Sequence, residues 1–164
     1  MTPEGGAGAG LRAKVLTVSD GVAEGTREDR SGAGLVARLE REGYEVVAHE
    51  VVPDGAGEVA TALLHMVDGF AGLVVTTGGT GFGPRDRTPE GTAAVVDRDA
   101  PGLAEAMRAA DPRGRLTRGR AGTYGPALVL NLPGSPTGAV ECLEVVLDVL
   151  PHALQLLAGH HPPH

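Results

Sequence analysis

The chain has one cysteine, one lysine and almost no aromatic residues, and each scarcity excludes a class of protein. The single cysteine, Cys142, cannot form a disulfide within the chain, and its apolar helical surroundings predict a small buried residue. Aromatic residues are 2% of the sequence and tryptophan is absent, so Leu, Val and Ala must build the core. Acidic residues outnumber basic ones, and the net charge of -7 disfavours a nucleic-acid binder, which needs clustered cations.

The amino-terminal segment MTPEGGAGAG lacks the basic and apolar regions of a secretory signal peptide. No run of the sequence approaches the ~18 apolar residues that a membrane span needs. Since domains cluster at roughly 100–150 residues, we expect one domain over residues 13–159, between a flexible leader at 1–12 and a disordered tail at 160–164. With one cysteine and no membrane segment, the sequence predicts a cytoplasmic protein.

Strand and helix signals alternate along the expected domain. Short apolar runs predict strands at residues 13–18, 44–52, 71–75 and 127–132. Helical spacing and helix-start signals predict helices at 31–42, after Gly55, at 89–97 and at 101–110, and a long last helix that Pro151 kinks. Residues 111–126 are rich in Gly and Arg and have no clear assignment. The repeated alternation predicts an α/β fold, a three-layer α/β/α sandwich with a mostly parallel sheet.

The stretch TTGGTGFGPRDRTPEGT, residues 76–92, is the most informative part of the chain. It directly follows the apolar run at 71–75 and carries several closely spaced glycines before Asp86. In an open α/β sheet, ligands bind just beyond the carboxyl ends of the strands. A glycine-rich turn at that place lets backbone N–H groups surround an anion, most often a phosphate. The stretch therefore predicts a phosphate-binding loop with its own carboxylate, called the glycine loop (residues 78–86) from here on.

Two common nucleotide motifs do not fit the sequence. A Walker A loop ends in Gly-Lys-Ser or Gly-Lys-Thr, and no lysine lies near the glycine loop. A dinucleotide fingerprint spaces its glycines differently, and Pro84 occupies the place of the third glycine. Residues 32–37 satisfy a relaxed form of that fingerprint, but they do not directly follow a strand, as the fingerprint requires. We therefore do not expect nicotinamide or flavin redox chemistry.

Four loops follow predicted strands, and the carboxyl ends of parallel strands lie at one edge of a sheet. These loops contain residues 19–21, 53–54, the glycine loop and residues 132–135. We expect this arrangement to bring Asp54 and Asp86 together, where a divalent cation would turn their repulsion of phosphate into coordination. Mg²⁺ prefers such oxygen ligands. The alternative is that both aspartates are ordinary turn or helix-cap residues, since Asp is common in both places.

Several motifs of the chain resemble those of a known family. The segments TVSDGVAEGTREDRSG, VVPD, TTGGTGFGPRDRTPE, PGL and NLPGSP occur in this order between Thr17 and Pro136. Together they resemble the MogA/MoaB family of molybdenum-cofactor biosynthesis proteins, whose domain also occurs in plant Cnx proteins and in gephyrin. The resemblance covers residues 14–159, and its central loop is long and specific. It implies an α/β/α sandwich that assembles as a homotrimer.

The resemblance also implies an activity. Members of the family transfer AMP from Mg²⁺-bound ATP to the terminal phosphate of molybdopterin and release pyrophosphate. Asp54 and Asp86 occupy the positions of the family's two essential aspartates, so the resemblance implies that they are catalytic and hold Mg²⁺. The other residues that it implies for the nucleotide and pterin sites are Ser19, Asp20, Gly78, Gly79, Thr80, Gly81, Pro133, Gly134 and Ser135.

One segment departs from the family pattern. Residues 116–122 read LTRGRAG, where relatives commonly have Leu-Ser-Arg before a variable residue and Ala-Gly. Thr117 can supply the same hydroxyl as the serine, and Arg118 could pair with a phosphate, so both are candidate binding residues. The alternative is that they are polar loop residues without a ligand.

Two other functions are compatible with the same resemblance. One is a pterin-binding paralogue with weak or no adenylylation activity, and the other is a trimeric scaffold, as in gephyrin. A scaffold is normally joined to further domains, and the sequence contains no linker, which favours the enzyme. We expect molybdopterin and ATP as ligands, a molybdenum-insertion protein as a downstream partner, and neither nucleic acid nor a membrane.

Overall fold

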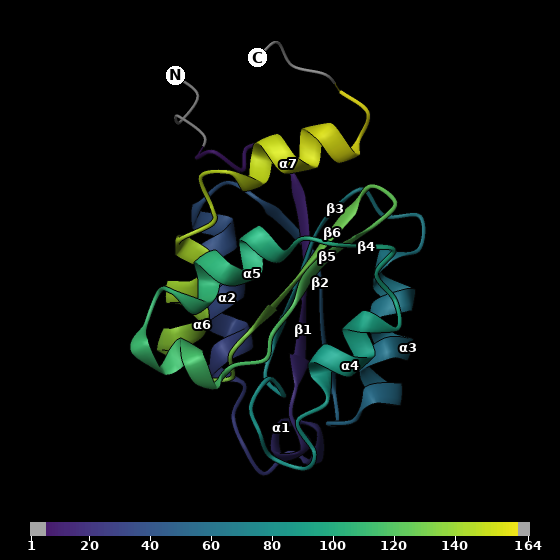
Figure 1. Ribbon diagram of the computed structural model, residues 1–164. Coiled ribbons are helices and arrows are strands. Elements are labelled where there is room, and N and C mark those ends of the chain that lie inside the picture. The colour runs from purple at the N-terminus through teal and green to yellow at the C-terminus, as the bar shows by residue number, and fades with distance from the viewer. Residues whose placement is uncertain (1–5, 161–164) are drawn as a thin grey trace.

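The computed structural model describes residues 6–160, which form a six-stranded sheet with helices on both faces (Figure 1). The strands are β1 Arg12–Val18, β2 Glu45–Val52, β3 Gly72–Thr77, β4 Arg98–Asp99, β5 Ala121–Tyr124 and β6 Ala127–Leu132. The α-helices are α1 Asp20–Glu24, α2 Arg30–Arg41, α3 Ala56–Val67, α4 Thr88–Ala93, α5 Pro101–Arg108, α6 Pro136–Glu144 and α7 Leu150–Leu157. A 3-10 helix, η1, spans Pro112–Leu116.

The strands lie in the order β2-β1-β3-β6-β5-β4. The first four are parallel neighbours, whereas β5 is antiparallel to β6 and β4 is antiparallel to β5. Every residue of β3 and β6 is buried, as expected for central parallel strands covered on both faces. The sheet is therefore mostly parallel, as the alternation of strand and helix signals predicts.

Two apolar clusters lie on opposite faces of the sheet. On one face, α2, α5, α6 and α7 pack against the strands through residues such as Leu35 and Leu143. On the other face, α3 buries Val59 and Leu63, and α4 lies beside α3 (Figure 1). The predicted three-layer α/β/α sandwich is confirmed, and Leu, Val and Ala supply most of its buried residues. None of the helices in residues 6–160 is long and apolar enough to cross a membrane.

The last helix is the clearest structural correction to the sequence prediction. It is not one kinked helix but two, α6 and α7, separated by a turn at residues 145–149. Pro151 lies in the first turn of α7, where its missing N–H costs nothing, whereas in a continuous helix its ring would clash with the preceding turn. As a result α7 lies across the end of the molecule opposite α1 (Figure 1).

The unassigned segment and one predicted loop contain short elements. Residues 111–126 form η1 and β5, and β5 pairs with β6 as an antiparallel hairpin. The predicted loop after β1 contains α1, whose N-cap Ser19 accepts a hydrogen bond from the Val22 N–H. Such elements are too short for hydrophobic periodicity to reveal, so pairing with a neighbour or a cap specifies them.

The domain boundaries can be compared with the structure only in part. Residues 1–5 of the predicted leader and 161–164 of the predicted tail lie outside the described residues. Within the described part, Gly8 N–H donates to the Glu42 carbonyl at 3.0 Å, and Arg12 already belongs to β1. The carboxyl half of the expected leader is therefore part of the fold. Cys142 is buried, as predicted, with its thiol 3.4 Å from the Met107 carbonyl.

Candidate active site at the carboxyl ends of the parallel strands

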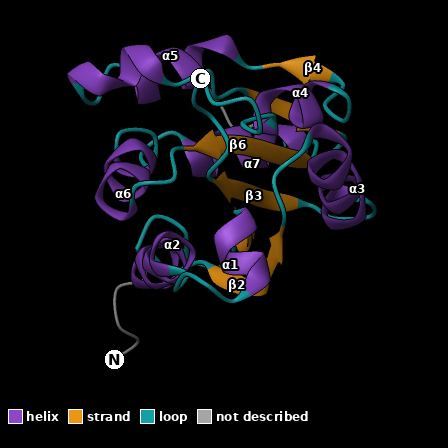
Figure 2. Cartoon of the chain, turned by 90° about the horizontal axis from the view of Figure 1, so that it is seen from below, coloured by secondary structure: helices purple, strands orange, loops and turns teal. Residues whose placement is uncertain are grey.

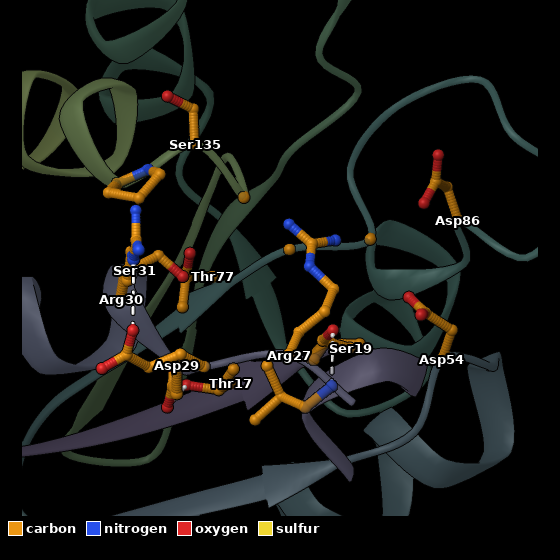
Figure 3. A pocket seen from close by; sticks show the side chains of 17 residues that line it. Thr17, Ser19, Arg27, Asp29, Arg30, Ser31, Asp54, Thr77, Asp86 and Ser135 are labelled. Carbon is orange, nitrogen blue, oxygen red and sulfur yellow. Dashed lines mark hydrogen bonds and ion pairs between the residues drawn. The ribbon is translucent and has the colours of Figure 1, made fainter. Parts of the chain in front are cut away.

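A cavity of about 600 Å³ opens at the carboxyl ends of the four parallel strands. Figure 2 looks onto this end of the sheet, and Figure 3 shows side chains that line the cavity. The predicted site residues in its wall are Ser19, Asp54, Gly78, Gly79, Asp86, Gly134 and Ser135. They come from all four loops that the sequence predicts to converge, so β1, β2, β3 and β6 each contribute to one site.

A second, smaller cavity of about 320 Å³ adjoins the first. The two cavities share Gly79, Asp86 and Gly134. Thr80, Gly81, Thr117 and Pro133, all candidate binding residues, line this second cavity. Of the predicted site residues, Asp20 and Arg118 line neither cavity, and both form ion pairs instead.

The beginning of the glycine loop requires glycine. Gly78 and Gly79 have φ angles of +100° and +68°, and a Cβ on Gly78 would clash with the Val18 carbonyl oxygen. Gly78 N–H donates to the Leu132 carbonyl at 3.1 Å, and the Thr88 hydroxyl donates to the Gly78 carbonyl at 2.9 Å. Gly78 therefore fixes the loop to its neighbours and has no N–H left for a ligand.

The next three residues of the loop differ from Gly78 in this respect. Within residues 6–160, the N–H groups of Gly79, Thr80 and Gly81 donate to no protein acceptor. They lie at the wall of one or both cavities, where they can donate to an anion. Residues 79–81 are therefore the part of the loop whose backbone N–H groups are available to an anion.

Asp54 and Asp20 are linked by reciprocal hydrogen bonds between two strand ends. Asp20 N–H donates to Asp54 Oδ2 at 3.0 Å, and Asp54 N–H donates to Asp20 Oδ1 at 3.1 Å. Arg85 adds a bidentate ion pair to Asp20, at 2.6 and 3.0 Å, and donates to the Asp54 carbonyl at 2.9 Å. Asp20 is therefore neutralised within the protein and has a positioning role, whereas Asp54 keeps one carboxylate oxygen without a protein donor among the described residues.

Asp54 and Asp20 have opposite electrostatic surroundings. Burial raises the pKa of Asp54, and the nearby charges of Asp20 and Asp86 add to the rise. The Arg85 guanidinium holds the pKa of Asp20 below its usual range. A raised pKa means that the folded state binds the proton of Asp54 more tightly than the unfolded state does. Above its folded pKa, ionised Asp54 therefore lowers the stability of the folded state. This cost becomes smaller as the pH falls toward the ordinary pKa of an aspartate.

Replacing Asp54 by Asn should raise the free energy of unfolding at pH 7.5 by roughly 0.5 kcal/mol, a typical gain from removing an unfavourable charge. Asn keeps an oxygen that can accept the Asp20 N–H bond, so only the charge is lost. Urea unfolding at pH 7.5 and 4.5 measures the gain, which should be smaller at the lower pH. Asp20→Asn is the matched control and should destabilise, because it removes the Arg85 ion pair. An Asp54→Asn protein less stable than wild type at pH 7.5 would contradict this account.

Asp86 is the last residue of the glycine loop, and its side chain folds back against the loop backbone. Its Oδ2 accepts a hydrogen bond from Gly83 N–H at 2.9 Å, and a Cβ on Gly81 would lie only 3.0 Å from the same oxygen. On the opposite side, a Cβ on Gly79 would lie 3.2 Å from Asp54 Oδ1. Both carboxylates thus approach the loop backbone closely, so that a Cβ added at Gly79 or Gly81 would contact them.

Arg118 holds the glycine loop through its guanidinium, and the pairing with a phosphate that the sequence suggests for it stays a prediction. Its guanidinium donates to the carbonyls of Gly81 and Asp86 at 2.9 and 2.7 Å and to both carboxylate oxygens of Glu90 at 2.9 and 3.0 Å. The Arg118 N–H also donates to the Thr80 carbonyl at 2.7 Å. This pairing holds the pKa of Glu90 below its usual range.

Replacing Arg118 by Met should lower the free energy of unfolding by roughly 1–2 kcal/mol, since the ion pair is partly exposed and each charged hydrogen bond contributes modestly. Backbone amides of residues 80–86 should exchange their hydrogens faster, because the loop loses its tether. Arg118→Lys should restore little, since lysine cannot form the same planar fork. Arg41→Met, at an exposed position on α2, is the control, with an expected change within about 0.5 kcal/mol. Unchanged exchange in the loop would contradict the tethering role.

The structure also brings residues to the cavity that the sequence does not single out. Thr17, Arg27, Asp29, Ser31 and Thr77 line it (Figure 3). Asp29 caps α2 by accepting the Gly32 N–H bond at 2.9 Å, and its other oxygen contacts Thr17 and His49. The signal that points to Thr17, Arg27, Asp29 and Ser31 is their position in the motif TVSDGVAEGTREDRSG, which begins at the end of β1, and Thr77 lies at the end of β3 directly before the glycine loop. Only the folded chain distinguishes which of them face the cavity.

The donor set is compatible with Mg²⁺ held jointly by protein and ligand. Within residues 6–160, no group of three or more His, Cys, Asp or Glu side chains is placed to hold a metal by itself. Asp54 and Asp86 supply carboxylate oxygens beside the phosphate-binding amides. Mg²⁺ in nucleotide enzymes is commonly bound by one or two carboxylates together with substrate phosphates. The residues present fit a metal of that kind.

A mostly parallel α/β sheet with a glycine loop and two carboxylates at its strand ends is typical of α/β proteins that bind phosphorylated ligands. The family described as "Probable molybdopterin binding domain" matches residues 14–152. The chain belongs to this family, that of the MogA/MoaB proteins of molybdenum-cofactor biosynthesis.

Curated proteins and solved structures give the same likeness. The molybdopterin adenylyltransferase of Helicobacter pylori is 36% identical over 154 residues, which cover 90% of this chain and 88% of that protein. The molybdopterin biosynthesis enzyme MoaB of Thermus thermophilus has 47% identity and a TM-score of 0.86, covering 91% of this chain and 97% of that one. The Mog protein of Mycobacterium ulcerans has 39% identity and a TM-score of 0.83, covering 90% and 99%. The resemblance read from the motifs is confirmed.

Proposed function

We propose that this protein is a molybdopterin adenylyltransferase, which transfers AMP from ATP to the terminal phosphate of molybdopterin. The observation that carries the proposal is the pair of adjoining cavities that share Gly79, Asp86 and Gly134. A transfer between two substrates requires both to lie beside the same reacting groups. The larger cavity, which has both carboxylates in its wall, is assigned to ATP, and the smaller one to molybdopterin. The names of its relatives support the same activity.

In the proposed reaction, an oxygen of the molybdopterin phosphate attacks the α-phosphorus of ATP. A new P–O bond forms, the bond from the α-phosphorus to the bridging oxygen breaks, and its electron pair leaves with pyrophosphate. The attacking phosphate is already ionised, so no strong general base is needed. The protein contributes positioning and charge stabilisation, to which the N–H groups of Gly79, Thr80 and Gly81 are suited.

Asp54 and Asp86 are proposed to hold Mg²⁺ against the ATP phosphates. When bound, the ion would neutralise phosphate charge in the ground state and in the transition state. Asp20 and Arg85 position Asp54, and Arg118 and Glu90 position the loop that carries Asp86. Chelation with EDTA should then abolish transfer.

The test of the activity is direct. The protein is incubated with molybdopterin, ATP and MgCl₂, and the products adenylylated molybdopterin and pyrophosphate are measured. Equal amounts of both products support the proposal, and their absence with bound molybdopterin would indicate a pterin-binding paralogue. Formation of pyrophosphate without adenylylated molybdopterin would contradict the proposed transfer of AMP to molybdopterin.

The remaining proposals concern assembly and location. We propose that the protein is a homotrimer, on the basis of the family resemblance. We also propose that it is cytoplasmic, on the basis of its single, buried cysteine. A solution mass of three times 16.6 kDa would support the trimer. A trimer that binds molybdopterin but transfers no AMP would favour the scaffold.

A further inference from the structure

Arg27 differs from the other arginines of the site because its charge is unpaired. It lines the larger cavity, and Figure 3 shows its side chain extending between Asp54 and Asp86 on one side and Thr77 and Ser135 on the other. Within residues 6–160, its guanidinium has no hydrogen bond or ion pair with the protein. A guanidinium in this position offers all its donors to a ligand.

Three neighbouring cations are already paired. Arg85 pairs with Asp20, and Arg118 pairs with Glu90. Arg30, the other cation in the cavity wall, is 3.3 Å from Glu28, and its side chain is 76% exposed. Within the described part of the chain, Arg27 is thus the one cation at this cavity that has no carboxylate partner.

The acidic residues of the cavity wall also differ in whether protein groups already neutralise or bind them. Glu28 pairs with Arg30, and Asp29 accepts hydrogen bonds from Gly32 N–H and Thr17. Asp54 and Asp86 each accept one backbone N–H bond, but within residues 6–160 neither forms an ion pair, and both face the cavity with Arg27. Two carboxylates suited to a metal and one guanidinium suited to an anion form a site for a metal–phosphate complex, since arginine matches phosphate geometry.

The backbone holds the base of Arg27 in place. The turn that ends α1 is closed by hydrogen bonds from the N–H groups of Thr26 and Arg27 to the Gly21 carbonyl, at 2.9 and 3.1 Å. The Arg27 stem lies over Gly21, where a Cβ would come within 2.6 Å of Arg27 Cδ. Glycine at this position lets the stem lie flat across α1, which directs the guanidinium toward the cavity.

From this arrangement we propose that Arg27 binds the phosphate chain of ATP and stabilises the charge that moves onto the leaving pyrophosphate. The inference rests on the proposed function and adds a cationic binding residue to it. In the transfer, the electron pair of the broken P–O bond resides on pyrophosphate, and a guanidinium beside it offsets that charge.

The experiment compares Arg27→Gln with Arg41→Gln, a control that removes the same charge from an exposed position on α2 outside both cavities. Isothermal titration with ATP and with pyrophosphate, each in MgCl₂ and without molybdopterin, should give about 10- to 100-fold weaker binding for Arg27→Gln. Arg41→Gln should bind within about 3-fold of wild type, because its exposed side chain lies in neither cavity wall. Arg27→Lys should fall between wild type and Arg27→Gln. The urea midpoints of all variants should match wild type, since Arg27 is exposed.

Different outcomes separate this inference from the proposed function. Wild-type protein that binds no ATP would overturn both. Wild-type protein that binds ATP, together with an Arg27→Gln variant of equal affinity for ATP and pyrophosphate, would overturn the role of Arg27 alone. A variant that loses affinity for molybdopterin but not for ATP would also overturn it, because Arg27 would then serve the acceptor.

Discussion

Replacing Asp86 by Asn should abolish AMP transfer, with kcat lower by about 1,000-fold or more, while the protein remains folded. The estimate follows because a coordinated cation contributes several kcal/mol to transition-state charge stabilisation, and each 1.4 kcal/mol is about tenfold in rate. Asn retains an oxygen that can accept the Gly83 N–H bond now made by Asp86. The loss therefore reflects charge and coordination, and product formation in the molybdopterin assay measures it.

Two comparisons make the Asp86 result specific. Asp148→Asn removes the same charge from an exposed position in the turn between α6 and α7, and it should leave kcat unchanged. Higher MgCl₂ concentrations should recover part of the activity of Asp86→Asn if the lost contact is a metal ligand. Full turnover by Asp86→Asn would overturn the assignment of Asp86, since among residues 6–160 no other carboxylate lies in both cavity walls.

Replacing Gly78 by Ala should lower the free energy of unfolding by about 3 kcal/mol or more and abolish ATP binding. Two effects add: alanine is strained at φ +100°, and its Cβ would clash with the backbone oxygen of Val18, which cannot rotate away. The displaced loop would also lose its hydrogen bonds to Leu132 and Thr88. Urea unfolding and ATP titration measure the two losses separately.

Gly57→Ala is the matched control for this glycine. Gly57 lies in the first turn of α3, has no atom within 4 Å of an added Cβ, and does not have a positive φ. Alanine there should be neutral or stabilise by up to about 1 kcal/mol, because it favours the helix. A Gly78→Ala protein as stable as Gly57→Ala would show that the loop adapts, and the requirement for glycine would then be wrong.

The parallel strands could be predicted closely because their signal is local. The prediction at 127–132 coincides with β6, and the prediction at 13–18 is one residue shorter than β1. A strand that is buried on both faces has to be a continuous apolar run, and that run is visible in the sequence. β4 and β5 could not be predicted, because two to four residues carry no periodicity and depend on pairing with the neighbouring strand.

The candidate site could likewise be predicted from the sequence only in part. Asp54, Asp86 and the residues around the glycine loop follow from motifs at strand ends, and the structure brings them to one cavity. The role of Arg118 could not be deduced, because its partner Glu90 is 28 residues away in the sequence. The burial that raises the pKa of Asp54 likewise depends on segments distant along the chain.

The sequence by itself determined the fold class, the family and the edge of the sheet that carries the site, because apolar runs, glycine positions and motif order are local properties. Only the tertiary structure decided which charges remain free. Arg85 and Arg118 look no different from Arg27 in the sequence. The first two are neutralised by Asp20 and Glu90, at separations of 65 and 28 residues, whereas Arg27 faces the cavity without a carboxylate partner among residues 6–160. Ion pairing depends on distances of a few ångströms, and the packing of helices and loops around the sheet sets them.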